Sequence, residues 1–408
     1  MHFDYESPHL DADLDYIYTW FLYTDLDTDS SYHNFGGSVT GKALEEALQV
    51  EVGAERRQVL SNPLDVIPPS QLPLSGNLVD RDLYYVNPSY VHKFRNATIV
   101  DMNYVYEDFS YDDPTVQGNV NHDARISVDN FARGQGLTWA LRYLWQETVY
   151  EISLPWKYQQ ASAELGFWAT RRARLFARAG KESPWDDPFD YSLKYSFWEA
   201  GFAYGVRDRL RAEFAIGERE FGSSWRGEFD YTFDWGNTVF SYSEKPTTRG
   251  FRGQNRRIPS DDPSDLDDYL DRPGSAESFI ANRLLWQLNL NFRRTKVSLN
   301  VFDELREDRI RPDGSPLPDQ AQLGARALVS WNPGPRSEVR LTGRFVNRES
   351  ESGEESDFLQ ATFRLGYDLS RRTTLSLAYS YSEQTPVSGE ATREYTANVV
   401  SLFLTISI

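Results

Sequence analysis

The stretch "TTLSLAYSYS", residues 373–382, alternates large apolar side chains with small ones. Successive side chains of an extended strand point to opposite faces. One face of this stretch therefore carries Leu375, Leu377, Tyr379 and Tyr381, and the other carries Ser376, Ala378, Ser380 and Ser382. A period of two predicts a β-strand with one apolar face and one small, polar face.

The same alternation recurs along the whole chain, for example in residues 10–22, 100–107, 137–146, 210–216, 225–233, 286–292 and 363–368. About 20 such segments of roughly 9–14 residues can be counted, and a strand that crosses a membrane needs about 9–11 residues. Strands of soluble β-proteins are usually only about 5–6 residues long. The less apolar face carries Arg, Asp, Glu and Asn, which favours a water-filled lumen over a packed core.

The connections between these segments are of two alternating kinds. Short basic turns are found at "FRNA" (94–97), "TRRAR" (170–174), "VRDR" (206–209), "RRTK" (293–296), "PGPRS" (333–337) and "SRRTT" (370–374). Longer, mostly acidic loops are found at 25–31, 107–114, 182–190, 260–271, 347–357 and 382–394. Outer-membrane barrels have this asymmetry, with short periplasmic turns and longer extracellular loops.

These patterns predict an all-β fold: a single antiparallel up-and-down transmembrane β-barrel over residues 1–408, with about 20 strands and a range of roughly 18–22. The sheet must close, because an open edge in lipid leaves backbone groups without hydrogen bonds. A barrel of that size has a lumen wider than side chains alone fill. The longest connection, about residues 249–277, either folds inward as a constriction or covers the mouth.

The two ends of the chain carry their own signals. "MHFDYESPHL" has no basic and apolar regions of a signal peptide and is similar to the end of a strand. We therefore expect a signal peptide and one or more strands upstream of it. The ending "NVVSLFLTISI" looks like the last-strand signal of outer-membrane proteins, with Ile408 in place of the usual terminal aromatic residue.

Composition excludes several classes of function. The net charge of -18 argues against nucleic acid as a partner, and the absence of cysteine excludes disulfides, thiolate metal sites and covalent haem attachment. We expect no cofactor and no metal. The acidic run at 260–271 could gather calcium, but it lacks the glycine and ligand spacing of an EF-hand loop, and a solvated charge run is favoured.

Charged residues on the polar face are the candidates for lining the lumen. They are Arg211, Glu213, Arg226, Glu228, Asp230, Arg340, Arg344, Arg364 and Asp368. One interpretation is a mixed-charge wall that guides a polar or anionic solute; the other is cross-strand ion pairs that hold the shape of the barrel. Tryptophans near the strand ends, such as Trp225, Trp286 and Trp331, are typical of interfacial girdles.

The chain is not expected to be an enzyme. All five histidines lie in its first third, and a Ser–His pair at the rim, as in outer-membrane phospholipases, would have to use one of them. His92 and His122 are the candidates for this alternative. Polar surface or lumen positions explain both residues more simply.

The segment "SFWEAGFAYGVRDRLRAEFAIGEREFGSSWRGEFDYTFDWGNTVFSYSEKPTTR" (196–249) and the ending "YTANVVSLFLTISI" resemble the outer-membrane β-barrel family associated with PEP-CTERM and exosortase systems. The resemblance implies a role in exopolysaccharide secretion or matrix assembly in a Gram-negative outer membrane, with no catalytic residues. The implied partners are outer-membrane lipid, exopolysaccharide and periplasmic export components. Two functions are compatible with this fold: a passive pore or exporter component, and a structural sleeve that holds a partner protein.

Overall fold

A computed structural model of the chain describes most of its residues. The described residues are 2–22, 29–61, 78–95, 97–130, 136–187, 190, 192–206, 209–248, 275–311, 314–350, 355–370, 373–388 and 394–406. The predicted acidic run 260–271, most of the long connection 249–277 and Ile408 lie outside them. Within the described part of the chain, no helix is long and apolar enough to cross a membrane.

The regular elements are strands. They are β1 (His2–Glu6), β2 (Leu10–Leu22), β3 (Asp29–Ala43), β4 (Leu48–Leu60), β5 (Leu78–Lys93), β6 (Ile99–Tyr111), β7 (Asn119–Asn130), β8 (Leu137–Tyr150), β9 (Trp156–Trp168), β10 (Ala173–Glu182), β11 (Tyr195–Val206), β12 (Leu210–Arg219), β13 (Gly222–Phe233), β14 (Gly236–Thr248), β15 (Ser278–Asn291), β16 (Thr295–Ile310), β17 (Gln320–Gly334), β18 (Ser337–Ser350), β19 (Glu355–Ser370), β20 (Thr373–Ser388) and β21 (Tyr395–Ile406).

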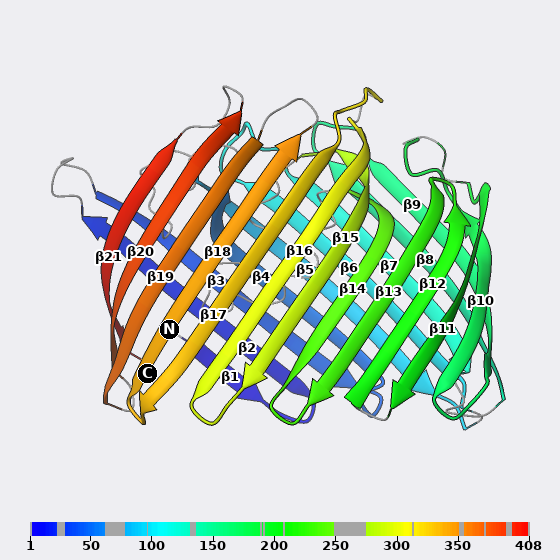
Figure 1. Ribbon diagram of the computed structural model, residues 1–408, viewed down its shortest axis with the longest axis horizontal. Helices are drawn as coiled ribbons and strands as arrows, with labels where there is room; N and C mark the ends of the chain where they lie inside the picture. Colours follow the sequence, from blue (N-terminus) through cyan, green and yellow to red (C-terminus); the bar gives the residue numbers. More distant parts are fainter. Residues whose placement is uncertain are drawn as a thin grey trace.

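The strands form one antiparallel up-and-down sheet of 21 strands, in which each strand pairs with its neighbours in the sequence. The sheet curves so that β15–β21 form a front wall and the early strands form a back wall (Figure 1). The predicted fold class, a large antiparallel barrel of about 20 strands, is confirmed.

The connections at the two ends of the barrel differ in length, as predicted. At one end, the lower one in Figure 1, tight turns such as 234–235, 292–294 and 335–336 join consecutive strands. The other end has longer connections, including 183–194 and 249–277, although the β12–β13 turn at this end is only Glu220 and Phe221. We call these ends the turn side and the loop side, and the turn side corresponds to the periplasmic end of such barrels.

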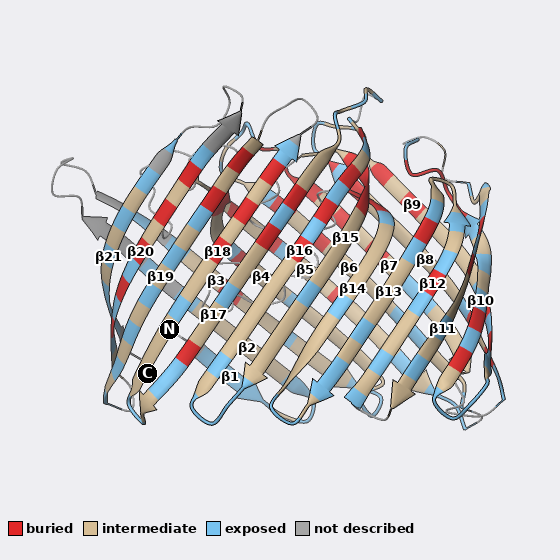
Figure 2. Cartoon of the chain, in the orientation of Figure 1, coloured by how far each residue is buried: buried red, intermediate tan, exposed pale blue. Residues whose placement is uncertain are grey.

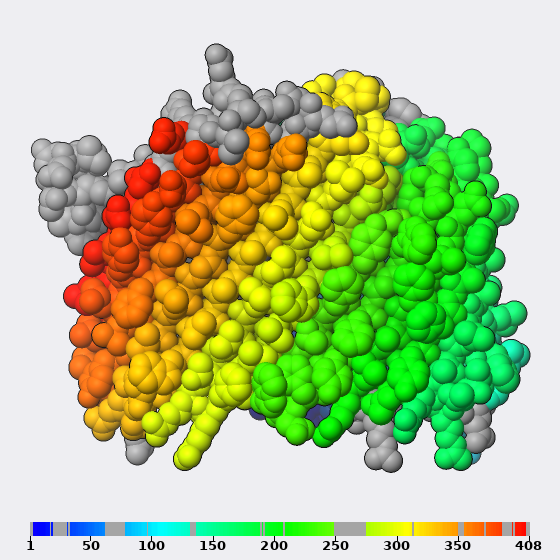
Figure 3. All heavy atoms as spheres, viewed as in Figure 1, coloured from blue at the N-terminus to red at the C-terminus, as the bar shows by residue number. Residues whose placement is uncertain are grey.

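Each strand presents an apolar face outward, and β20 shows this most simply. Leu377 is 46% exposed and Tyr379 is 44% exposed, whereas Ser376 before them and Ser382 after them are 1% and 0% exposed. The face assignment of the "TTLSLAYSYS" stretch is therefore confirmed for these residues. Side chains of neighbouring strands pack side by side over the outer surface, which is continuous across the front wall in Figure 3. This surface is the part that contacts lipid.

Many inward-facing side chains in the loop-side half of the barrel are shielded from water. Buried residues gather in the loop-side half of many strands (Figure 2), and many of them are polar residues of the inward face, such as Asn121, Glu304, Arg306 and Gln322. On the loop side, other protein groups therefore cover many of the polar side chains that the sequence predicted to face water. The turn-side half of the inward face keeps partly exposed side chains.

Two apolar clusters explain the packing on the loop side. In the first, Leu60 of β4 packs with Phe302, Val346 and Phe358 of β16, β18 and β19, so it joins the back wall to the front wall. The second contains Trp156 and Tyr158 of β9, Trp185 of the β10–β11 connection and Ile280 of β15. Both clusters join strands that are far apart in the sheet. Side chains therefore cross the interior of the barrel on the loop side.

Candidate lumen lining

The nine predicted lumen residues lie on the inward faces of four strands. These are Arg211 and Glu213 on β12, Arg226, Glu228 and Asp230 on β13, Arg340 and Arg344 on β18, and Arg364 and Asp368 on β19. The alternate positions of the same strands are exposed apolar residues, among them Phe214, Phe229, Leu341 and Phe363. The structure brings the β12 and β13 residues together in one group and the β18 and β19 residues together in another.

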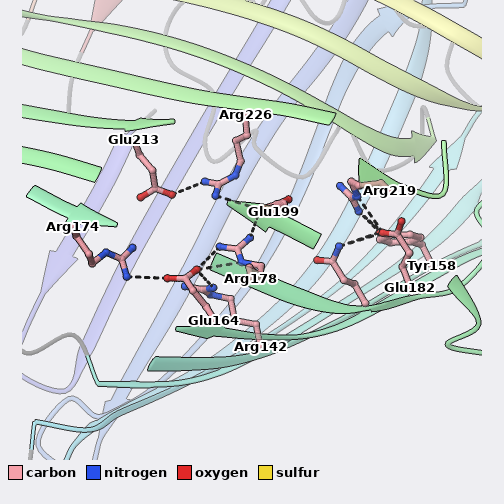
Figure 4. Close-up of polar contacts among 11 residues, drawn as sticks. Arg142, Tyr158, Glu164, Arg174, Arg178, Glu182, Glu199, Glu213, Arg219 and Arg226 are labelled. Carbon is pink, nitrogen blue, oxygen red and sulfur yellow. Dashed lines mark hydrogen bonds and ion pairs between the residues drawn. The ribbon is translucent and has the colours of Figure 1, made fainter. Parts of the chain in front are cut away.

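A buried carboxylate organises the first group from neighbouring strands. Glu164 of β9 accepts hydrogen bonds from Arg142 of β8 at 2.7 Å, and from Arg174 and Arg178 of β10 at 2.9 Å and 2.8 Å (Figure 4). Arg178 lies directly opposite Glu164 in the β9–β10 ladder, and this register brings the two side chains within hydrogen-bonding distance. The Glu164 side chain is only 1% exposed, so its charge depends on these arginines.

The network continues along the sheet to the predicted residues. Arg178 lies 3.2 Å from Glu199 of β11, and Arg226 lies 3.6 Å from Glu199 and 2.7 Å from Glu213. Arg211 and Glu228 form a further ion pair, which is longer, at 3.8 Å, and exposed. Carboxylates and arginines alternate across β8–β13, and we call this part of the inward face the balanced band. For the predicted residues of β12 and β13, these contacts fit the interpretation that they form cross-strand ion pairs.

A second polar group holds the β10–β11 connection inside the barrel. Trp185 is buried, and its backbone carbonyl accepts a hydrogen bond of 3.0 Å from the indole nitrogen of Trp156. Beside it, Glu182 accepts hydrogen bonds from Arg219 at 2.5 Å and from the Tyr158 hydroxyl at 2.7 Å. We call residues 182–185, with these three wall residues, the latch. Figure 4 shows Arg219, Tyr158 and Glu182 converging.

The β12–β13 turn adds a titrating group next to the latch. The backbone N–H of Glu220 donates to Glu182 over 3.1 Å, which brings its side chain close to other acids. Burial, and then the charges of Asp186 and Glu182, raise the pKa of the Glu220 carboxyl to about 7. The charge of Glu220 therefore changes near neutral pH.

Arginine dominates the inward face of β17–β19. The residues are Arg326, Arg340, Arg344, Arg348 and Arg364, and the acids on the same inward faces are Glu338 and Asp368. Arg340 lies 3.1 Å from Glu338, while Arg344 donates to Gln360 at 3.1 Å and Arg364 donates to Ser376 at 3.3 Å. We call this region the arginine wall. It carries more positive than negative side chains.

The inward face of β1–β7 has the opposite charge, and we call it the acidic wall. Its acids are Asp4, Glu6, Asp11, Asp13, Asp15, Glu51, Glu55, Asp101, Glu107, Asp123 and Asp129, and its bases are Lys42, Arg57, Arg81, Lys93 and Arg125. Some of the acids are paired locally, as Glu55 is with Arg81 at 2.7 Å and Asp123 with Arg125 at 2.8 Å. The excess of acids remains, so the lumen is lined by walls of opposite charge.

The two candidate histidines lie among aromatic side chains. The Nδ1 atom of His122 is 2.7 Å from the Tyr104 hydroxyl, and its ring packs near Tyr106 and Trp145. His92 packs between Tyr90 and Phe94. These surroundings are those of an aromatic girdle. Within the described residues, no group of three or more histidine and acidic side chains could hold a metal ion.

Sequence reasoning missed Glu164, Arg178, Trp185 and the rest of the latch. The alternation at 137–146 placed Arg142 on a polar face, but it did not say which charged residue Arg142 meets. A signal was present in the tight 169–172 turn, since a short hairpin connection fixes the register of its two strands. The latch has no comparable signal, because Trp185 lies in a connection and reaches the wall only through tertiary packing.

Known structures support the fold. No family model and no curated protein matches the sequence. The siderophore receptor PirA from Acinetobacter baumannii matches with a TM-score of 0.50 and 8% identity, over 97% of this chain and 73% of that one. A mutant of the ferric enterobactin receptor PfeA from Pseudomonas aeruginosa matches with a TM-score of 0.51 and 8% identity, over 97% and 72% of the two chains.

At these identities the likeness shows the architecture alone. That architecture is the outer-membrane β-barrel, and the continuous apolar outer face has the surface that such a barrel presents to lipid. The chain is an outer-membrane β-barrel protein of the Gram-negative type, as the sequence predicted.

Proposed function

We propose that this barrel is an outer-membrane conduit for a hydrated, polar chain, and that the chain is an exopolysaccharide. The observation that carries the proposal is the inward face itself. It is polar or charged from strand to strand, and on the turn side its side chains are partly exposed. A polar, solvated inner surface is what a sugar polymer needs to pass without losing its hydrogen bonds to water.

The latch and the two apolar clusters represent the closed state of this conduit. They bury the inward face on the loop side, so transport requires that residues 183–185 of the β10–β11 connection leave the wall. Loops that open and close control access to many enzyme sites, and the same kind of change needs only contacts that can form and break. The conduit is therefore regulated, in contrast to a permanently open pore.

Hydroxyl and amide side chains support a carbohydrate cargo. The inward face of β20 carries Ser376, Ser380, Ser382 and Gln384, and the back wall carries Asn87, Asn103, Asn119 and Asn121. Groups of this kind exchange hydrogen bonds with sugar hydroxyls as readily as with water. The resemblance of residues 196–249 to barrels of exopolysaccharide loci supports the same cargo.

A sleeve that encloses a partner protein is the alternative. Such a sleeve needs an unobstructed lumen, and the two clusters that cross the interior oppose it. Single-channel recording in planar bilayers separates the two functions. We expect low conductance for the native protein and larger, long-lived openings for Trp185→Gly, which removes the side chain that packs on Trp156.

The recording should also test the cargo. A neutral exopolysaccharide fragment added to the turn side should block the open variant in a concentration-dependent manner, whereas a sucrose control of equal mass concentration should not. If correctly folded Trp185→Gly protein carries no current, the conduit proposal is wrong. If current flows and the polysaccharide has no effect, the conduit stands and the exopolysaccharide assignment is rejected.

A further inference from the structure

We infer that the turn-side rim of the barrel binds the phosphate groups of acidic phospholipids in the adjacent leaflet through a ring of exposed arginines. These arginines lie in the short connections at that end, and we call them the arginine collar: Arg95, Arg171, Arg172, Arg209, Arg293, Arg294 and Arg336. The inference concerns the outer rim and the lipid around it. It therefore does not depend on what passes through the lumen.

The collar has few acids to balance its charge. In the turn-side connections that the structure describes, the acids are Glu45, Glu46 and Asp234. Asp234 pairs with Arg209 over 3.1 Å, and this is the one ion pair between a collar arginine and a described residue. The other guanidinium groups of the collar are therefore available to an anion from outside the protein.

The loop-side rim has the opposite charge. The acids of its described connections are Asp112, Asp113, Glu151, Asp186, Asp187, Asp190, Glu220, Glu277, Asp319 and Glu394, and the bases are Lys194 and Arg311. An anionic headgroup is attracted by the turn-side rim and repelled by the loop-side rim. This difference assigns the acidic lipid to the turn-side leaflet.

Exposed aromatic side chains lie next to the collar on the lipid-facing surface. The rings of Trp235 and Phe292 stack with their centroids 5.6 Å apart, and Trp331 is exposed on the neighbouring strand β17. Aromatic residues of this kind are enriched where a bilayer meets water. Arg293 and Arg294 directly follow Phe292, so they lie at the level of the lipid phosphates.

The backbone holds these two arginines in place. The N–H of Phe292 donates a hydrogen bond of 2.8 Å to the Thr295 carbonyl and closes the turn, and the carbonyl of Arg294 accepts one of 2.8 Å from Asn332 of β17. The Nη1 atom of Arg294 also donates to a backbone carbonyl of β17 over 3.3 Å. Because the turn is ordered before a lipid binds, binding costs little conformational entropy.

The collar follows the perimeter of the barrel, which favours lipid over a protein as its occupant. Phe94 precedes Arg95 between β5 and β6, and Phe292 precedes Arg293 between β15 and β16, with both phenylalanines exposed. Figure 1 places the first pair of strands in the back wall and the second in the front wall. A leaflet surrounds the barrel and reaches both positions, whereas a partner protein covers one side.

The chemistry of the headgroup decides which lipid is preferred. Guanidinium groups bind phosphate oxygens with two parallel hydrogen bonds. Phosphatidylglycerol carries a net negative charge, whereas the choline group cancels the phosphate charge in phosphatidylcholine. A basic residue near an acidic lipid surface strengthens association about fivefold, so the collar should prefer phosphatidylglycerol.

Electron spin resonance of spin-labelled lipids tests this inference. The full-length protein is reconstituted into phosphatidylcholine vesicles that contain a trace of phosphatidylglycerol or phosphatidylcholine with a spin label on its acyl chain. The immobilised fraction of the label gives the relative affinity of each lipid for the protein surface. We expect phosphatidylglycerol to be preferred about two- to fivefold at low salt, and less as salt screens the exposed charges.

Substitutions locate the binding surface. Arg293→Gln combined with Arg294→Gln should remove about half of the preference or more. The matched control is Arg56→Gln combined with Arg311→Gln, which removes two exposed arginines from the loop-side end of the barrel, where Arg56 pairs with Asp82. The control should keep the native preference, and the heat-dependent gel shift of each variant verifies folding.

Each outcome decides for or against the collar. Equal affinity for the two lipids at low salt overturns the inference, as does a double variant of the turn 292–294 with the native preference. A control variant that loses the preference to the same extent also overturns it, because net charge and not the collar would then attract the lipid. If the double variant does not fold, Arg336→Gln and the salt dependence of the native protein take its place.

Discussion

The indole nitrogen of Trp156 donates a hydrogen bond to the backbone carbonyl of Trp185, 3.0 Å away, and both side chains are buried inside the barrel. Trp156 begins a strand of the wall, whereas Trp185 belongs to the connection between two later strands. The contact therefore attaches a loop to the inner surface through one hydrogen bond and through apolar packing. These two contributions can be separated by substitution.

Trp156→Phe should keep the packing and lose the hydrogen bond, which costs about 1 kcal/mol of unfolding free energy. Trp185→Ala should cost about 3–5 kcal/mol, because it removes a buried ring. Thermal unfolding followed by the heat-dependent gel shift measures both. Trp331→Phe, at an outward position that is 48% exposed, is the control and should change stability little. Equal effects at Trp185 and Trp331 would show that the latch contributes nothing.

Glu164→Gln should be among the most destabilising single substitutions in the barrel. It removes the buried carboxylate that Arg142, Arg174 and Arg178 share, and breaking a buried ion pair typically costs about 3–5 kcal/mol. Urea-dependent unfolding in lipid vesicles measures the loss. The control, Glu228→Gln, breaks the exposed 3.8 Å contact with Arg211 and should cost no more than about 1 kcal/mol. A small effect at Glu164 would contradict its role as the centre of the balanced band.

Gly217→Ala should disrupt the pairing of β11 with β12. A Cβ atom at Gly217 would lie 2.0 Å from the backbone carbonyl oxygen of Trp198, and a backbone atom in a ladder cannot move away as a flexible side chain can. At Gly343 a Cβ atom would meet nothing within 4 Å, so Gly343→Ala is a matched control in another strand. The yield of heat-resistant folded protein should fall for the first variant and stay at the native level for the second.

The latch should hold more tightly in acid. The pKa of Glu220 is raised in the folded protein to about 7 from an ordinary value of 4.5, so the folded state favours the protonated carboxyl. This stabilisation is complete below about pH 4.5 and is lost as the pH rises through about 7. Because the side chain is partly exposed and screened, we expect a difference of the order of 1 kcal/mol between pH 5 and pH 8.

Glu220→Gln tests this pH dependence. It should unfold at a higher temperature than the native protein at pH 8, and its unfolding temperature should change less between pH 5 and pH 8. Conductance should follow the same order, with more openings of the native protein at pH 8. A native protein whose stability and conductance are the same at both pH values would argue against control by this carboxyl.

The outward face of β20 gives a prediction about lipid contact. Leu377→Arg places a charge on a face that is 46% exposed in the structure and is covered by acyl chains in the membrane. The cost should be about 2–4 kcal/mol if the residue lies near the middle of the bilayer. Ile152→Arg, in the exposed β8–β9 connection, should cost little. Folding into vesicles at a series of urea concentrations compares the two variants.

Much of this fold was predictable because its determinants are local. The alternation of Leu377 with Ser376 fixes which face of β20 is outward, and tight connections such as 335–336 fix which strands are neighbours. For the same reason the nine candidate residues share the face opposite the exposed apolar side chains of their strands. No feature of a single strand says how wide the barrel is or whether its walls touch.

The interior was predicted less well for that reason. Leu60 lies at the end of its strand with no mark that distinguishes it from an outward residue, yet it packs against Phe302 and Phe358 of the opposite wall. The polar inward face indicated water, but Arg306 and Glu304 are buried, with Arg306 donating to Glu304 over 2.7 Å. A polar face shows only that its side chains need hydrogen-bond or ion-pair partners. In this barrel, many of those partners are other side chains of the protein and not water.

The pairing of each strand with its neighbours in sequence also bears on how the molecule assembles. Most ladders close a short stretch of chain, so hairpins can form one after another with little loss of loop entropy. The contact of Leu60 with Phe358 joins residues about 300 positions apart. Forming it costs loop-closure entropy, and this cost becomes smaller once the intervening strands are paired. The wall can therefore form first, and the interior on the loop side is sealed last.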